Sequence, residues 1–141
     1  MKKRIFLAVV SLILFLGMLI YSREATTATT ESPVKIEMRL LDSAFRNLIS
    51  SLILNNPAGI EAPFHEVHRA KMITEKAIER GEIKLPKNGD KMKEFIEMDE
   101  QFHRKLEELL AASGKGDMKK VQDATHRLLD GCVQCHQRFR N

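Results

Sequence analysis

The chain has 141 residues, which is enough for one domain with a modest core. Leu, Met, Ala, Glu and Lys are plentiful, Trp is absent and Tyr occurs once, a composition that favours helices. The net charge of +4 comes from Lys2, Lys3, Arg4 and Arg23, which flank the first apolar segment. Without these four, basic and acidic residues balance at 19 each, so charge gives no support for a nucleic-acid partner.

The chain begins with three basic residues followed by an uncharged apolar run, residues 5–21, a pattern typical of an export signal. The run is longer than a usual signal core and slightly short for a membrane span, so a cleaved signal and a retained anchor are both open. We expect residues 1–23 to be a signal peptide or membrane anchor and residues 24–32 a linker. The body, residues 33–141, is then expected in the periplasm, either free or anchored to the outer side of the cytoplasmic membrane.

Two amphipathic helices are predicted next. The first begins at Ser32 and Pro33, because serine suits a helix cap and proline the first helical position, and it ends at residues 55–57. The second runs from about residue 62 to Arg80, with Gly81 as its stop. The expected core positions of the two helices are Val34, Met38, Leu41, Phe45, Leu48 and Leu52, then Phe64, Val67, Ala70, Ile73, Ala77 and Ile78.

Two further helices are predicted after a loop at residues 82–89. The third starts near Asp90 and ends at residues 113–114, and Asp117 is the expected cap of the fourth. Their expected core positions are Phe95, Met98, Phe102, Leu106 and Leu109, then Val121, Thr125, Leu128, Cys132, Cys135 and Phe139. Four such helices with short connections predict an all-α, antiparallel four-helix bundle, a fold that holds cofactors between facing helices.

Near the C-terminus, residues 132–136 read CVQCH, the attachment motif of c-type haem. Cys132 and Cys135 lie three positions apart, so on a helix both thiols can reach one porphyrin edge, and His136 can bind the iron as proximal ligand. A thiol-redox motif normally follows a strand, and no strand is expected near this motif. A zinc site needs a second ligand pair at zinc spacing, and the sequence contains none. A simple disulfide is the remaining alternative. We expect one covalently attached haem c.

The tail of the chain, residues 131–140, resembles the class II cytochromes c, meaning cytochrome c′ and its low-spin, methionine-ligated relatives. It fits their pattern of C-x-x-C-H-x-x-aromatic-Arg, and the resemblance covers residues 33–140, most strongly over the last two helices. It implies a four-helix bundle with Cys132 and Cys135 as thioether attachments and His136 as proximal ligand. It also implies that Arg140 can neutralise a haem propionate, and it allows a homodimer formed through the first two helices.

The resemblance further implies that a residue of the first helix faces the other side of the iron, and that residue is Met38. A methionine at helical spacing can equally be a plain core residue. His68, one turn after Phe64, is the alternative sixth ligand, and an open sixth position is the third possibility. His65 lies nearer the polar side of its helix, and two other histidines are expected at the surface, His103 and His126.

The ligand set decides the expected function. With both axial positions filled, the protein is expected to carry single electrons between redox partner proteins; bis-histidine ligation through His68 would leave this role unchanged. With an open position it would bind NO or CO. A membrane-anchored helical adaptor without haem would leave the CVQCH motif unexplained. No nucleophile–base set points to an enzyme, and membrane contact is expected only through the N-terminal segment.

Overall fold

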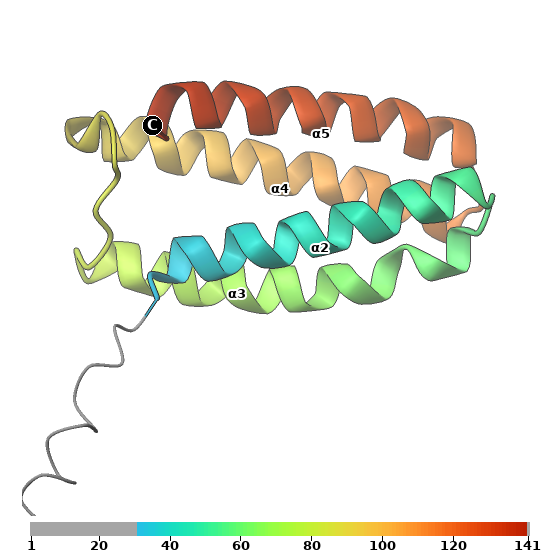
Figure 1. Ribbon diagram of the computed structural model, residues 1–141, viewed down its shortest axis with the longest axis horizontal. Coiled ribbons are helices and arrows are strands. Elements are labelled where there is room, and N and C mark those ends of the chain that lie inside the picture. Colours follow the sequence, from blue (N-terminus) through green and yellow to red (C-terminus); the bar gives the residue numbers. More distant parts are fainter. Residues whose placement is uncertain (1–30, 141) are drawn as a thin grey trace, which may run out of the picture. The chain divides into compact units, whose positions relative to one another are not determined.

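The computed structural model describes residues 31–140. These residues form four α-helices in the order α2 (Pro33–Ile53), α3 (Glu61–Glu79), α4 (Met92–Gly114) and α5 (Met118–Phe139), with short 3-10 turns at η2 (Pro57–Gly59) and η3 (Gly89–Lys91) (Figure 1). The described residues contain no strand, which confirms the all-α, four-helix prediction. None of the described helices is apolar over a sufficient length to span a bilayer. The predictions for residues 1–23 and for nearly all of the linker lie outside the described range.

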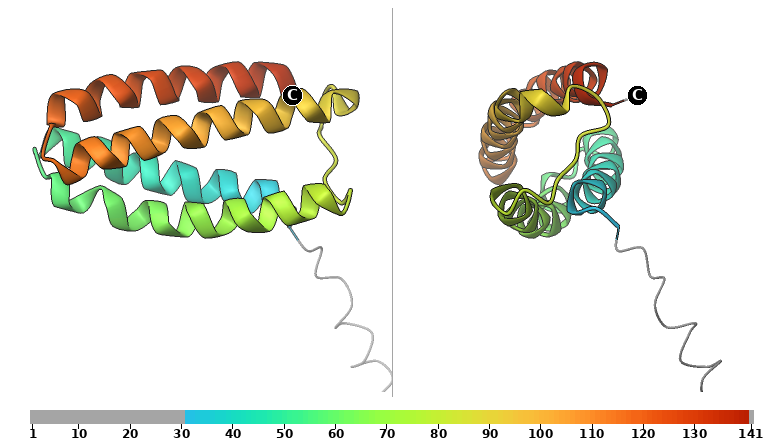
Figure 2. Two further views of the ribbon diagram at one scale, coloured as in Figure 1. Left: turned by 180° about the vertical axis from the view of Figure 1, so that it is seen from behind. Right: turned by 90° about the vertical axis from the view of Figure 1, so that its left-hand side faces the viewer.

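The helices form two antiparallel hairpins, α2 with α3 and α4 with α5, and the backbones approach most closely within each hairpin. Seen end-on, the helices occupy the corners of a square, so that α5 neighbours α4 and α2 while α2 and α4 lie diagonally opposite (Figure 2). The interior between the two hairpins is therefore bounded by all four helices. Such an interior is where bundles hold their cofactors.

The apolar core is one cluster to which all four helices contribute. Phe45 packs edge to face on Phe64, with ring centroids 5.9 Å apart, and lies 6.3 Å from the ring of Phe102. The prediction for α3 was wrong at one position: Ile73 is 58% exposed, and Thr74 is buried in its place. Buried positions of α3 follow one another at steps of three and four residues, which puts Thr74 on the inner row and turns Ile73 away from it.

The helix ends agree with the predicted stop residues but only partly with the predicted caps. Asp117 caps α5, because its side chain accepts a hydrogen bond from the backbone N–H of Lys120 at 3.1 Å. Ser32 precedes α2 as expected, but its side chain makes no capping hydrogen bond. Gly81 follows α3 with φ of +68°, a conformation that glycine adopts without strain.

Gly116, in the turn between α4 and α5, has φ of +69°. We expect Gly116→Ala to lower the free energy of unfolding by about 1–2 kcal/mol, because a Cβ is disfavoured in the left-handed region. Gly114→Ala is the matched control, since its Cβ would meet open space and its φ is ordinary. Urea denaturation of both variants tests this. An equal loss in both would show that the turn conformation is not the cause.

Candidate functional site

The CVQCH motif lies in the last two turns of α5, and its side chains are partly buried. Cys132 and Cys135 are one turn apart, are both half-buried and are free thiols. Val133 and Gln134 between them are exposed. The helix therefore presents the two sulfur atoms on one side, as attachment to one porphyrin edge requires.

The two thiols of the motif and its imidazole have shifted pKa values because they are partly buried. Burial raises the pKa of Cys132, and it raises that of Cys135 to about 11, with the nearby charge of Asp99 adding to the effect. Redox-active cysteines instead have a lowered pKa. Partial burial, together with the charge of Arg140, lowers the pKa of His136, which favours the neutral imidazole that binds metals.

Contacts from α4 and from the loop before it fix the end of α5. Phe139 packs edge to face on Phe95, with centroids 5.5 Å apart, and the Arg138 guanidinium donates two hydrogen bonds to the Glu94 carboxylate at 2.8 and 2.9 Å. The side-chain amide of Asn88 donates to the carbonyl oxygen of Arg138 at 2.6 Å. The predicted loop at residues 82–89 thus forms a hydrogen bond with the helix that carries the motif.

The bundle interior near the motif is polar. His103 Nε2 lies 3.0 Å from Glu37 Oε1 and 3.7 Å from Asp99 Oδ1, and the three side chains are 8%, 1% and 15% exposed. Burial, together with the charge of Glu37, raises the pKa of Asp99. The prediction that His103 is a surface residue was therefore wrong. The turn of α4 that carries Asp99 and His103 faces the bundle interior, and Glu37 of α2 meets His103 there.

Sequence reasoning missed these three residues although a signal was present. Glu37 precedes Leu41 by four positions, and Asp99 follows Phe95 by four, so each lies on the row of a buried apolar residue. Neither was predicted as a core position, because charged side chains usually face solvent. The partner across the bundle, His103, cannot be inferred from spacing within one helix.

The candidate sixth ligands differ in their placement. Met38 is half-buried on α2 and packs against the core cluster. His68 is exposed on α3, as is His65, which lies 3.8 Å from Glu61. His126 is exposed, as predicted. Of the two predicted ligand candidates, only Met38 is in contact with the core.

Arg140 lies just beyond α5 and is exposed, with its backbone N–H donating to the carbonyl oxygen of His136 at 2.9 Å. An exposed guanidinium next to His136 could pair with a carboxylate of a bound porphyrin. Arg138, by contrast, forms an ion pair with Glu94. The donor set of the motif thus fits a covalently attached haem: two free thiols on one helix side, an adjacent neutral imidazole and a nearby cation.

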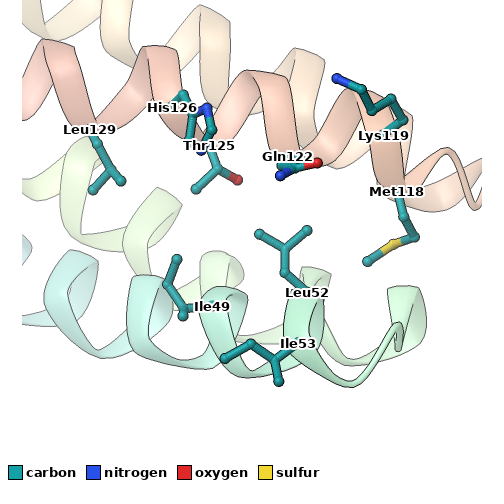
Figure 3. A pocket seen from close by; sticks show the side chains of 9 residues that line it. All are labelled: Ile49, Leu52, Ile53, Met118, Lys119, Gln122, Thr125, His126 and Leu129. Atoms are coloured by element: carbon teal, nitrogen blue, oxygen red, sulfur yellow. The ribbon is translucent and has the colours of Figure 1, made fainter.

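A separate groove lies between α2 and α5, towards the start of α5 and away from the motif (Figure 3). Ile49, Leu52 and Ile53 line it from α2, and Met118 and Leu129 line it from α5. Its walls are mostly apolar and carry neither cysteine of the motif. The groove is therefore not the site at which haem would be attached.

Comparison with known proteins gives one family. Residues 79–140, which include the loop, α4 and α5, match the family model described as Cytochrome C′. Neither the curated proteins nor the solved structures give a significant match. The matched residues contain the whole attachment motif, and the all-α bundle is the fold that this family has. This match supports assigning the chain to the class II cytochrome c family, and with it a haem c cytochrome.

Proposed function

We propose that the protein is an extracytoplasmic monohaem cytochrome that carries single electrons. In this proposal Cys132 and Cys135 form the thioether bonds, His136 is the proximal ligand and Arg140 pairs with a propionate. The observation that carries it is the placement of two free, half-buried thiols on one side of α5 with the imidazole next to them. Bound haem c supplies one-electron chemistry at its iron. The chain's own residues hold it, orient it and exclude water from one side.

Met38 is the proposed sixth ligand. It is half-buried and in contact with the core on α2, whereas an exposed His68 would have to turn inward to reach any interior group. A thioether ligand raises the reduction potential relative to a second histidine. Ligation by both His136 and Met38 would leave no place on the iron for a substrate, which favours electron transfer over catalysis or gas binding.

The optical spectrum of the haem-loaded protein tests the ligand. We expect a low-spin spectrum with a sulfur-to-iron charge-transfer band that CO leaves unchanged and that Met38→Ala abolishes. Met118→Ala is the matched control, because Met118 is also half-buried against the core but lies at the start of α5. A low-spin spectrum that depends on His68 would contradict Met38 as ligand. A high-spin spectrum that shifts with CO would make NO or CO binding the function.

The remaining parts of the proposal concern place and partners. The basic and apolar start of the chain supports export to the periplasm, with membrane contact only through that segment. Redox partner proteins are the expected partners, and the overall charge balance supports no nucleic acid. Ile49 and Ile53, 40% and 78% exposed, support a homodimer through α2.

A further inference from the structure

We infer that Glu37, Asp99 and His103 form a polar wall of the haem pocket, and that the two carboxylates favour the oxidised iron and so lower its reduction potential. His103 acts as a positioning residue that holds Glu37 inside the bundle. The inference rests on the proposed attachment of haem through Cys132 and Cys135. It also uses Met38 as the proposed sixth ligand.

The first step is the position of Asp99 along the bundle. Phe95 of α4 packs on Phe139 of α5, and Phe102 of α4 lies 3.7 Å from where a Cβ of Gly131 would be. Asp99 lies between the two α4 residues of these contacts. Since the helices are antiparallel, Asp99 is level with the α5 segment between Gly131 and Phe139, which contains the motif.

The second step is the position of Glu37. It belongs to α2, which lies diagonally across the bundle from α4 (Figure 2), yet its carboxylate oxygen is 3.0 Å from the His103 imidazole nitrogen. The contact therefore crosses the interior between the two hairpins. Met38, the proposed sixth ligand, is the next residue of the same helix. A porphyrin held by Cys132 and Cys135, with Met38 as a further ligand, would lie near this contact.

The cluster formed by Glu37, Asp99 and His103 has an excess of acidic groups. Two carboxylates, Glu37 and Asp99, share one imidazole as their short-range partner. Lys71 of α3 lies close enough to lower the pKa of Asp99, but it is ion-paired with Glu75. The cluster of Glu37, Asp99 and His103 therefore carries more acidic than basic groups, and these side chains are shielded from water. Exposed charges elsewhere on the bundle are screened by solvent.

The fourth step is the effect on iron. Reduction of the haem removes one positive charge from the iron, and burial, net charge and hydrogen bonding around a haem set its potential. In an interior of low dielectric constant, a nearby carboxylate stabilises the more positive, oxidised state much more than a solvated one does. Replacing a buried carboxylate by its amide removes this charge while keeping the shape. The reduction potential should then rise.

The test is a spectroelectrochemical titration of the haem-loaded full chain at one mildly alkaline pH, comparing Glu37→Gln and Asp99→Asn with the unchanged protein. Both variants are expected to shift the potential to more positive values with an unchanged optical spectrum. Glu100→Gln is the matched control, because it makes the same charge change next to Asp99 on a side chain that is 54% exposed. Its shift should be clearly smaller. His103→Ala should also shift the potential to more positive values, because Glu37 is then released to solvent.

Two results would overturn the inference. Shifts in Glu37→Gln and Asp99→Asn no larger than that of Glu100→Gln would show that the carboxylates do not act on the iron. A change of spin state in His103→Gln would show that the imidazole is an iron ligand rather than part of a wall. Failure of the proposed function looks different, because the protein would then bind no haem or would show a high-spin, CO-sensitive spectrum. Circular dichroism of each variant confirms that the bundle is folded.

Discussion

The double variant Cys132→Ala/Cys135→Ala is expected to fold into the helical bundle but to carry no covalently bound haem. Each thioether needs one cysteine sulfur, and the structure contains no other thiol in the described residues. Both side chains are only half-buried and neither belongs to the apolar core cluster, so their truncation leaves the main packing intact. The expected loss of attached haem is complete.

The measurement is a haem stain of the protein after denaturing electrophoresis, which retains only covalently bound haem. Each single variant should keep one thioether bond and a weakened stain. Val133→Ala is the matched control: Val133 lies between the two cysteines on α5 but is 55% exposed, so its loss should leave attachment unchanged. Haem that stays with the double variant through denaturation would refute the assignment of both cysteines. Circular dichroism separates loss of haem from loss of fold.

The fold could be predicted from the sequence because its helices are amphipathic and end at strong stop residues. Gly81, for example, adopts the positive φ that glycine tolerates and follows the end of α3 as predicted. The motif could be recognised for the same local reason, because two cysteines and a histidine at this spacing are typical of haem c attachment. Local patterns of this kind need no knowledge of the neighbouring helices.

The predictions that failed depend on which side of a helix faces the core or on contacts between helices. Ile73 was expected inside, but the weak apolar row of α3 does not show which of two adjacent residues points inward, and Thr74 does. His103 was expected at the surface because it follows Phe102. Its burial depends on Glu37, which lies 66 positions away in the chain and on another helix. No periodicity within α4 could reveal that partner.

The second large effect is expected on stability. Phe64→Ala should lower the free energy of unfolding by about 3–5 kcal/mol, because it removes a large side chain from a site that cannot fully collapse. Phe64 is 2% exposed and packs edge to face on Phe45 at an interplanar angle of 83°. Ile73→Ala is the control on the same helix and should cost no more than about 0.5 kcal/mol, as is usual at exposed positions.

Urea denaturation of the haem-loaded variants, followed by circular dichroism, measures both values. Equal losses would contradict the assigned inner row of α3 and restore Ile73 to the core. The result also bears on the site, because the rings of Phe64, Phe45 and Phe102 form a continuous series. Phe102 lies 3.7 Å from where a Cβ of Gly131 would be, next to Cys132. Phe64 itself is on α3, which lies diagonally opposite α5 (Figure 2). Phe64→Ala should therefore weaken the bundle while leaving the haem spectrum unchanged, which separates the packing of the core from the chemistry of the motif.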